Sequence, residues 1–160
     1  MGMALRIRPL QSEDAERVAI LDAACAFSAH WPATAYAMQK DGFLQGWVAA
    51  TPANPESLRG FIAVRCAADE MEILNLAVLP ESRRQGIART LLDATVANVR
   101  DRDLHRIYLE VREANDAAIA FYRAMGFDQI GRRSKYYSGP VDDALVFVRV
   151  LSDSSGSSRR

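Results

Sequence analysis

Short stretches of the chain alternate apolar and polar positions, which is typical of β-strands with one buried and one exposed face. The second, third and fourth of these stretches follow one another closely enough to form an antiparallel meander. Between the second and third, the segment Thr51–Ser57 contains two prolines and an asparagine and has the composition of a turn. The predicted strands are Ala4–Pro9, Phe43–Ala50, Leu58–Cys66, Glu70–Leu79, Arg106–Arg112, Phe127–Arg133 and Val141–Leu151.

Other stretches repeat apolar residues every three or four positions, as amphipathic helices do. The first of them begins after Ser12, whose hydroxyl is the expected N-cap. The last is followed by Gly126, in the position where glycine commonly ends a helix. The predicted helices are Ser12–Phe27, a short segment between Pro32 and Lys40, Gly86–Arg100 and Asn115–Met125.

The length of the chain, 160 residues, fits one domain, because two domains would each have a marginal core. We expect this domain to span residues 1–151. Residues 152–160 are rich in serine and lack an apolar anchor, so they are predicted to form a disordered tail.

Charge and cysteine content narrow the classes of function. The 20 Lys and Arg residues equal the 20 Asp and Glu residues, so the chain lacks the basic excess typical of nucleic-acid-binding proteins. Cys25 and Cys66 have no second Cys or His at metal-ligand spacing, which predicts buried free thiols and no metal. No stretch approaches the roughly 20 apolar residues of a membrane helix, and the N-terminus lacks a signal-peptide core. We therefore expect a cytoplasmic protein without membrane or nucleic-acid partners.

A basic segment with a glycine lies between a predicted strand and the longest clear helix. The first N–H groups of a helix have no intrahelical partner and can bind an anion, and small residues let a phosphate approach the backbone. The segment lacks the Gly-Lys-Ser/Thr ending of a nucleoside-triphosphatase loop and the GxGxxG run of a dinucleotide loop. By itself it fits a phosphate site and a ligand-free basic helix end equally well. Its residues are Arg83, Arg84, Gln85, Gly86, Ile87, Ala88 and Arg89.

Two residues farther along the chain have the chemistry of a general base and a general acid. Glu110 interrupts an otherwise apolar strand, and Tyr122 lies on the helix that follows. Each also has a plain structural explanation, since a strand glutamate can face solvent and a helix tyrosine can belong to the core. Asn115 has the alternative role of helix N-cap. Their common position after the basic segment favours a shared function.

The order of these motifs resembles the GNAT superfamily of N-acetyltransferases. Arg83–Ala88 fits its Gln/Arg-x-x-Gly-x-Gly/Ala pyrophosphate motif at every defined position. Within the superfamily, the chain is similar to the bacterial ribosomal-protein-alanine N-acetyltransferases of the RimI type, densely from about residue 73 to 148. The similar stretches are Leu74–Val78, Leu109–Arg112, Asn115, Ala117–Ala120, Tyr122–Phe127, Arg132–Arg133 and Tyr136–Tyr137. The chain departs from this pattern at Ser134, where the family has Asn, and at Lys135, which intervenes before the tyrosines.

The resemblance implies an α+β (α/β) architecture, with a mixed, mostly antiparallel central sheet of about six to seven strands and about four helices. It also implies acetyl-CoA as co-substrate, Glu110 as general base and Tyr122 as general acid. The residues implied in cofactor binding are Leu76, Ala77 and Val78 for the acetyl and pantetheine moieties, Arg83, Arg84, Gln85, Gly86, Ile87, Ala88 and Arg89 for the pyrophosphate, and Asn115 for the cofactor arm.

Acetyl transfer from a thioester requires a neutral amine and a proton for the departing thiolate. An α-amine has a pKa of about 7.7–8.0 and lysine about 10.4, so deprotonation at pH 7 costs about 1 and about 4–5 kcal/mol respectively. We expect direct attack in a ternary complex, because neither cysteine lies in a nucleophile motif. A tyrosine of ordinary pKa protonates the thiolate downhill only if the site raises the thiolate pKa or lowers its own.

The resemblance implies a protein N-terminal α-amine as acceptor, and specifically the N-terminal alanine of ribosomal protein S18. An alternative is a GNAT enzyme that acetylates a small amine or a lysine side chain. A third possibility is a non-catalytic coenzyme A-binding protein, which would need neither Glu110 nor Tyr122.

Overall fold

The computed structural model describes residues 4–37, 44–99 and 103–151. Within these ranges the chain forms seven strands and four α helices, and four of the strand pairings are antiparallel. This confirms the predicted α+β class. The chain divides into two compact units, one made of residues up to Cys66 and from Ile73 to Val99, the other of Ala67–Glu72 and residues from Asp103 onward. A single domain over 1–151 stays a prediction, and the predicted tail lies outside the described residues.

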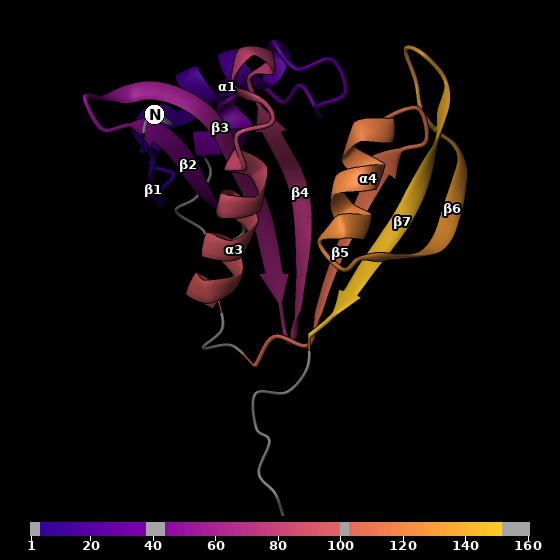
Figure 1. Cartoon of the computed structure of the whole chain (residues 1–160). Helices are drawn as coiled ribbons and strands as arrows, with labels where there is room; N and C mark the ends of the chain where they lie inside the picture. The colour runs from indigo at the N-terminus through magenta and orange to yellow at the C-terminus, as the bar shows by residue number, and fades with distance from the viewer. Residues whose placement is uncertain (1–3, 38–43, 100–102, 152–160) are drawn as a thin grey trace, which may run out of the picture. The chain divides into compact units, whose positions relative to one another are not determined.

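The first unit contains four neighbouring strands in chain order (Figure 1). The predicted turn over Thr51–Ser57 is too long, because Thr51 pairs with Asn54 and its hydroxyl donates to the Asn54 carbonyl at 2.9 Å. The hairpin therefore turns between these two residues. The strands are β1 (Arg6–Pro9), β2 (Gln45–Thr51), β3 (Asn54–Ala67) and β4 (Glu70–Val78), of which the first residues of β4 belong to the second unit.

Three α helices accompany these strands: α1 (Ala15–Ala23), α2 (Ala33–Ala37) and α3 (Ile87–Val99). The helix predicted over Gly86–Arg100 is confirmed within its described part, and it buries Ile87, Leu91 and Leu92. The short helix predicted before Lys40 is observed as α2, although residues 38–43 lie outside the described ranges. The core side chains of α1, α2, β2 and β3 include Val18, Leu21, Tyr36, Val48, Phe61 and Ala63.

The first predicted helix is wrong at both ends. Ser12 is not its N-cap, because residues Ser12–Asp14 form a 3-10 helix and the Asp14 carboxylate accepts the Gln11 N–H at 2.9 Å. The α-helix then ends at Ala23 rather than Phe27. The segment after it folds back onto a carboxylate of the helix itself.

That carboxylate belongs to Asp22, which is fully buried. It accepts hydrogen bonds from five donors: the N–H groups of His30 (3.1 Å) and Trp31 (2.8 Å), the hydroxyls of Ser28 and Tyr36, and the Asn75 amide (3.1 Å). We call these six residues the Asp22 cluster. It joins the segment between α1 and α2 to β4, and this contact stops α1 early.

The negative charge of the Asp22 carboxylate is stabilised by the hydrogen bonds that it accepts from neutral groups. Burial acts to raise the pKa of Asp22, but the hydrogen bonds from Ser28, Tyr36, Trp31 and Asn75 lower it overall. Burial and the neighbouring Asp22 carboxylate raise the pKa of Tyr36. Asp22 is therefore ionised and Tyr36 neutral at pH 7.

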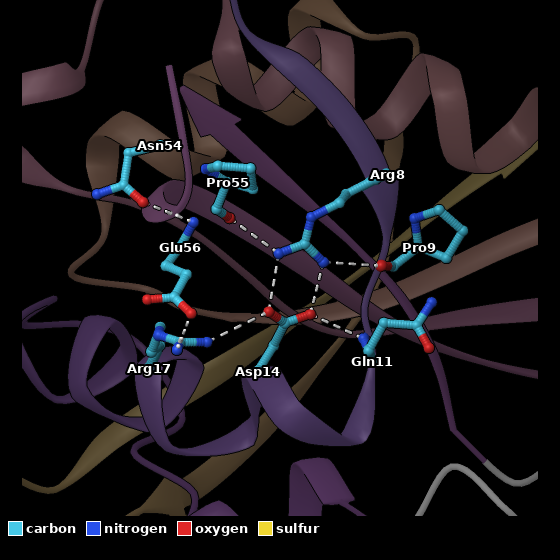
Figure 2. Close-up of polar contacts among 8 residues, drawn as sticks. All are labelled: Arg8, Pro9, Gln11, Asp14, Arg17, Asn54, Pro55 and Glu56. Carbon is cyan, nitrogen blue, oxygen red and sulfur yellow. Dashed lines mark hydrogen bonds and ion pairs between the residues drawn. The ribbon is translucent and has the colours of Figure 1, made fainter. Parts of the chain in front are cut away.

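A second polar network ties β1 to the hairpin between β2 and β3 (Figure 2). Arg8 binds Asp14 through two nitrogens at 2.7 and 2.8 Å and donates to the Pro55 carbonyl at 3.0 Å. Arg17 pairs with Glu56 at 2.9 Å. The planar guanidinium of Arg8 matches the carboxylate in this two-bond geometry, which fixes the orientation of both side chains.

The second unit orders its strands β5, β7, β6 (Figure 1). As predicted, β5 buries Ile107, Leu109 and Val111 on one face, while Arg106 is exposed and the other alternate positions are half-buried. Its elements are β5 (Arg106–Arg112), α4 (Asp116–Ala124), β6 (Asp128–Tyr137) and β7 (Asp142–Val150).

The variant Asp22→Asn tests the Asp22 cluster. An amide NH2 group would face hydrogen-bond donors, so we expect the free energy of unfolding at pH 7 to fall by about 3 kcal/mol. The folded-state pKa of Asp22 is depressed, so its stabilisation is complete above pH 4 and is lost as pH falls through the depressed value. The variant lacks that acid-sensitive contribution.

Urea unfolding measured from pH 7 to pH 3 checks this expectation. Asp93→Asn is the matched control, because the Asp93 side chain is 58% exposed and has a weak ion pair at 3.8 Å. We expect that control to change stability by less than about 0.5 kcal/mol. Equal stabilities of the two variants would contradict the role of Asp22.

Candidate active site

The backbone before α3 adopts a conformation suited to anion binding. Arg84 and Gly86 have positive φ angles of 62° and 76°, and α3 begins immediately afterwards at Ile87. A left-handed conformation costs a non-glycine residue about 1–2 kcal/mol, whereas glycine adopts it freely. A Cβ atom at Gly86 would meet nothing within 4 Å. The first N–H groups of α3 therefore lie beside an open and locally strained loop.

Positive charge gathers at this helix end. Arg83, Arg84 and Arg89 are all exposed, and Gln85 beside them is exposed as well. Arg89 has an ion pair with Asp93 at 3.8 Å. Cations near a helix N-terminus are unfavourable unless an anion lies close by. The geometry thus favours the phosphate alternative over a ligand-free helix end.

The end of β4 is fixed to the same loop within the first unit. The Val78 carbonyl accepts hydrogen bonds from Arg83 Nε at 3.2 Å and from the Cys25 thiol at 3.5 Å. Next to it, a Cβ at Gly60 would lie 3.0 Å from the Ala77 carbonyl oxygen. The predicted cofactor segment Leu76–Val78 is therefore held closely, and one of its carbonyls is already used by the chain.

Cys25 does not have the surroundings of a nucleophile. Burial raises the pKa of Cys25, against a lowering effect of Arg83, so the thiol is neutral at pH 7. Cys25 is buried as predicted, whereas Cys66 is only half-buried, and neither forms a disulfide. Among the described residues, no group of three or more His, Cys, Asp or Glu side chains could hold a metal ion. None of the described helices combines the length and apolar character needed to cross a membrane.

In the second unit, Asn115 is the N-cap of α4. Its side-chain oxygen accepts the Ala118 N–H at 3.2 Å. Gly126 follows this helix with φ of 90°, which confirms the predicted helix end. The structure thus gives Asn115 the capping role, and its contact with a cofactor stays a prediction.

Tyr122 projects from α4 into apolar surroundings. It is 7% exposed and lies edge-on to Phe121 and Phe127, with ring centroids 5.1 and 5.4 Å away. Burial raises the pKa of Tyr122 above its ordinary value, so the phenol stays protonated throughout the neutral range. Downhill proton transfer to a thiolate requires either a lowered tyrosine pKa or a raised thiolate pKa, and the burial of Tyr122 disfavours the first. The same apolar surroundings would raise the pKa of a thiolate brought beside the ring.

Glu110 lies on the opposite face of β5 from the buried Leu109. Leu109 pairs with Phe147, and the guanidinium of Arg123 in α4 lies 5.9 Å from the Phe147 ring, so α4 covers the Leu109 face. The Glu110 side chain is 22% exposed, and its Oε1 lies 2.8 Å from Arg133 Nε. Glu110 is therefore held by β6 and is not simply a solvent-facing strand position.

The predicted site residues divide between the two units. Leu76–Val78 and Arg83–Arg89 belong to the first, whereas Glu110, Asn115 and Tyr122 belong to the second. Glu110 and Tyr122 reach the two sides of β5. Sequence analysis assigned no role to Arg133 or to Tyr136, which hydrogen-bonds Glu110. The only sequence signal for them was their presence in the Arg-Arg and Tyr-Tyr pairs.

Comparison with known proteins identifies similar chains. The "[Ribosomal protein bS18]-alanine N-acetyltransferase" of Escherichia coli is 33% identical over 97 residues, which are 59% of this chain and 66% of that protein. The aligned region thus covers slightly less than two thirds of that relative's length.

Two solved structures have a similar fold. The ribosomal-protein-S18-alanine N-acetyltransferase from Escherichia coli has a TM-score of 0.81 at 23% identity, covering 98% of this chain and 100% of that one. Arabidopsis thaliana NAA60 in complex with acetyl-CoA has a TM-score of 0.80 at 23% identity, covering 92% and 99%. The acetyltransferase (GNAT) family model matches residues 5–127, well over half of the sequence, and the chain therefore belongs to that family.

Proposed function

We propose that this chain is an acetyl-CoA-dependent N-acetyltransferase that modifies the N-terminal α-amine of a protein. The observation that carries the proposal is the loop before α3, with its two left-handed residues and three exposed arginines. The chain belongs to the acetyltransferase (GNAT) family, which supports a role of this loop in cofactor binding. We propose that the loop binds the pyrophosphate of acetyl-CoA, and that Leu76–Val78 and Asn115 contact the rest of the cofactor.

The proposed reaction is direct aminolysis of the thioester. The acceptor nitrogen attacks the acetyl carbonyl carbon, a C–N bond forms and the C–S bond breaks. Glu110 takes the proton lost by the amine, directly or through a water, and Tyr122 gives its proton to the departing thiolate. The half-exposed position of Glu110 suits contact with an incoming amine, and the burial of Tyr122 suits a thiolate that must be kept from water. The products are an N-acetylated amine and free coenzyme A.

The proposed acceptor is the N-terminal alanine of ribosomal protein S18. The support is the similarity to the bS18-alanine enzyme of Escherichia coli and the lower pKa of an α-amine compared with lysine. A ribosomal acceptor would place the reaction in the cytoplasm. The alternatives are a small-molecule amine or a lysine side chain. The feature that keeps them in play is the departure from the RimI-type pattern at Ser134 and Lys135. A non-catalytic coenzyme A-binding chain would not need Glu110 or Tyr122.

Gly86→Ala tests the loop. A side chain at this positive φ strains the backbone, so we expect coenzyme A to bind about tenfold more weakly. Isothermal titration calorimetry with coenzyme A measures the change. Gly139→Ala is the matched control, since Gly139 also has a positive φ, 65°, and open space at its Cβ. If both variants bind coenzyme A as tightly as the wild type, the loop does not bind the cofactor.

Glu110→Gln and Tyr122→Phe test the acid–base pair. We expect each to lower kcat by about 10²–10⁴ while the Kd of acetyl-CoA stays unchanged. Amine-dependent thiol release gives kcat, and titration gives the Kd. Glu113→Gln and Tyr108→Phe change the same residue types elsewhere in the second unit and should leave kcat within about twofold. If both test variants turn over at a nearly normal rate, the proposed roles are wrong.

A peptide panel tests the acceptor. One peptide begins with the free N-terminal alanine of protein S18, a second has that terminus blocked and carries an internal lysine, and small amines complete the set. At pH 7 the neutral fraction of an α-amine exceeds that of lysine by about 200-fold or more. We expect mass spectrometry to find the free α-amine modified with the highest kcat/KM. A clear preference for a small amine or for lysine would establish the rival acceptor instead.

A further inference from the structure

Arg133 makes a direct contact with the proposed base. Its Nε lies 2.8 Å from Glu110 Oε1. The Tyr136 hydroxyl hydrogen-bonds the same carboxylate, and that bond together with the Glu110 charge raises the pKa of Tyr136. The Arg133 guanidinium also lies 5.7 Å from the centroid of the Tyr136 ring. Three side chains from two strands therefore form one cluster, Glu110–Arg133–Tyr136.

The sheet register explains how Arg133 reaches Glu110 across an intervening strand. Glu110 pairs with Val146 of β7, and Val146 pairs with Gly131 of β6. Residues two apart on a strand share a face, so Arg133 lies on the same face as Gly131 and Glu110. Its long side chain spans the distance over β7.

A bulge brings Tyr136 to the same carboxylate. Residues three apart on a regular strand point to opposite faces, which would separate Arg133 from Tyr136. The register of β6 shifts between Arg133 and Tyr137, and within this shift Lys135 has a φ of 52°. The Lys135 N–H donates to the Asp143 carboxylate at 2.9 Å, which holds the bulge in place. The residue that departs from the RimI-type pattern thus allows both side chains to meet Glu110.

The other charged groups on these strands have different partners. Arg132, next to Arg133, pairs with Glu113 at 2.7 Å and with Asp143 at 2.9 Å. The Arg112 guanidinium lies 4.3 Å from the Tyr137 ring centroid. Burial first, and then the charge of Glu110, raise the pKa of Tyr137 to about 12, with Asp142 adding to the effect. The charge of Glu72 in β4 adds to the rise in the pKa of Tyr136. Among the described residues, Arg133 is the cation that contacts Glu110.

We infer that Arg133 is a positioning residue for acetyl transfer, holding the Glu110 carboxylate in the orientation that receives the acceptor amine. The inference rests on the proposed role of Glu110 as base. In the reaction step the amine N–H bond breaks and its proton moves to the carboxylate, while Arg133 stays protonated. Because the Arg133 side chain is 60% exposed, water partly screens its attraction to the Glu110 carboxylate. We therefore expect its loss to have a moderate effect on turnover.

Arg133→Gln and Arg133→Lys test this inference. Removal of the guanidinium frees the Glu110 carboxylate to rotate, so in Arg133→Gln we expect kcat at pH 7 to fall about tenfold. The KM of the acceptor amine and the Kd of acetyl-CoA should stay unchanged, because the lost contact orients the base and does not bind either substrate. Arg133→Lys keeps a cation beside the carboxylate and should restore part of kcat.

Arg132→Gln is the matched control, because it breaks ion pairs on the same strand without touching Glu110. Its kcat and KM should equal those of the wild type. In a Glu110→Gln background, Arg133→Gln should cause no further loss of turnover.

The outcomes separate this inference from the proposed function. If Glu110→Gln keeps near-normal turnover, the assignment of the base is wrong and the inference fails with it. If Glu110→Gln is inactive while Arg133→Gln has the wild-type kcat, only the inference on Arg133 is overturned. Equal effects of Arg132→Gln and Arg133→Gln would also overturn it, since they would indicate a general structural role of β6.

Discussion

Positive charge at the amino-terminal end of α3 is the arrangement on which the functional proposal depends. The helix dipole already places partial positive charge there, and three exposed arginines add to it. The loop also holds Arg84 in a left-handed conformation that most residues avoid. These costs are offset when an anion accepts hydrogen bonds from the free N–H groups and interacts with the guanidiniums. A pyrophosphate meets both conditions without a metal ion.

Three carboxylates of the chain differ in their burial and in their hydrogen-bond and ion-pair partners. Asp22 is fully buried and receives hydrogen bonds from five neutral donors, so it joins two distant segments. Asp14 is held by the guanidinium of Arg8 in a two-bond ion pair. Burial acts to raise the pKa of Asp14, and the hydrogen bonds from Arg8 and Gln11 lower it overall. Glu110 differs because its side chain remains 22% exposed and has a partner that is itself exposed. Of the three, it is the one an external amine can approach.

Short-range patterns decided much of the fold. The bounds of β5 agree with the predicted strand, and α4 begins after the Asn115 cap and ends before Gly126 as expected. Both elements depend on alternation, capping and glycine conformation, which are properties of neighbouring residues. The loop before α3 was predictable for the same reason, because its place follows from the order of a strand, a glycine and a helix start.

Contacts between distant residues decided the rest. The early end of α1 depends on Asn75, which lies 53 positions from Asp22 and contributes a hydrogen bond that no local pattern contains. The placement of Arg133 and Tyr136 beside Glu110 depends on the register of β7 against both its neighbours and on a bulge held by Asp143. The sequence by itself determined most of the elements and the basic loop before α3, because these follow from local periodicity and composition. Only the tertiary structure decided which side chains surround the Glu110 carboxylate, because strand register and a bulge set those distances.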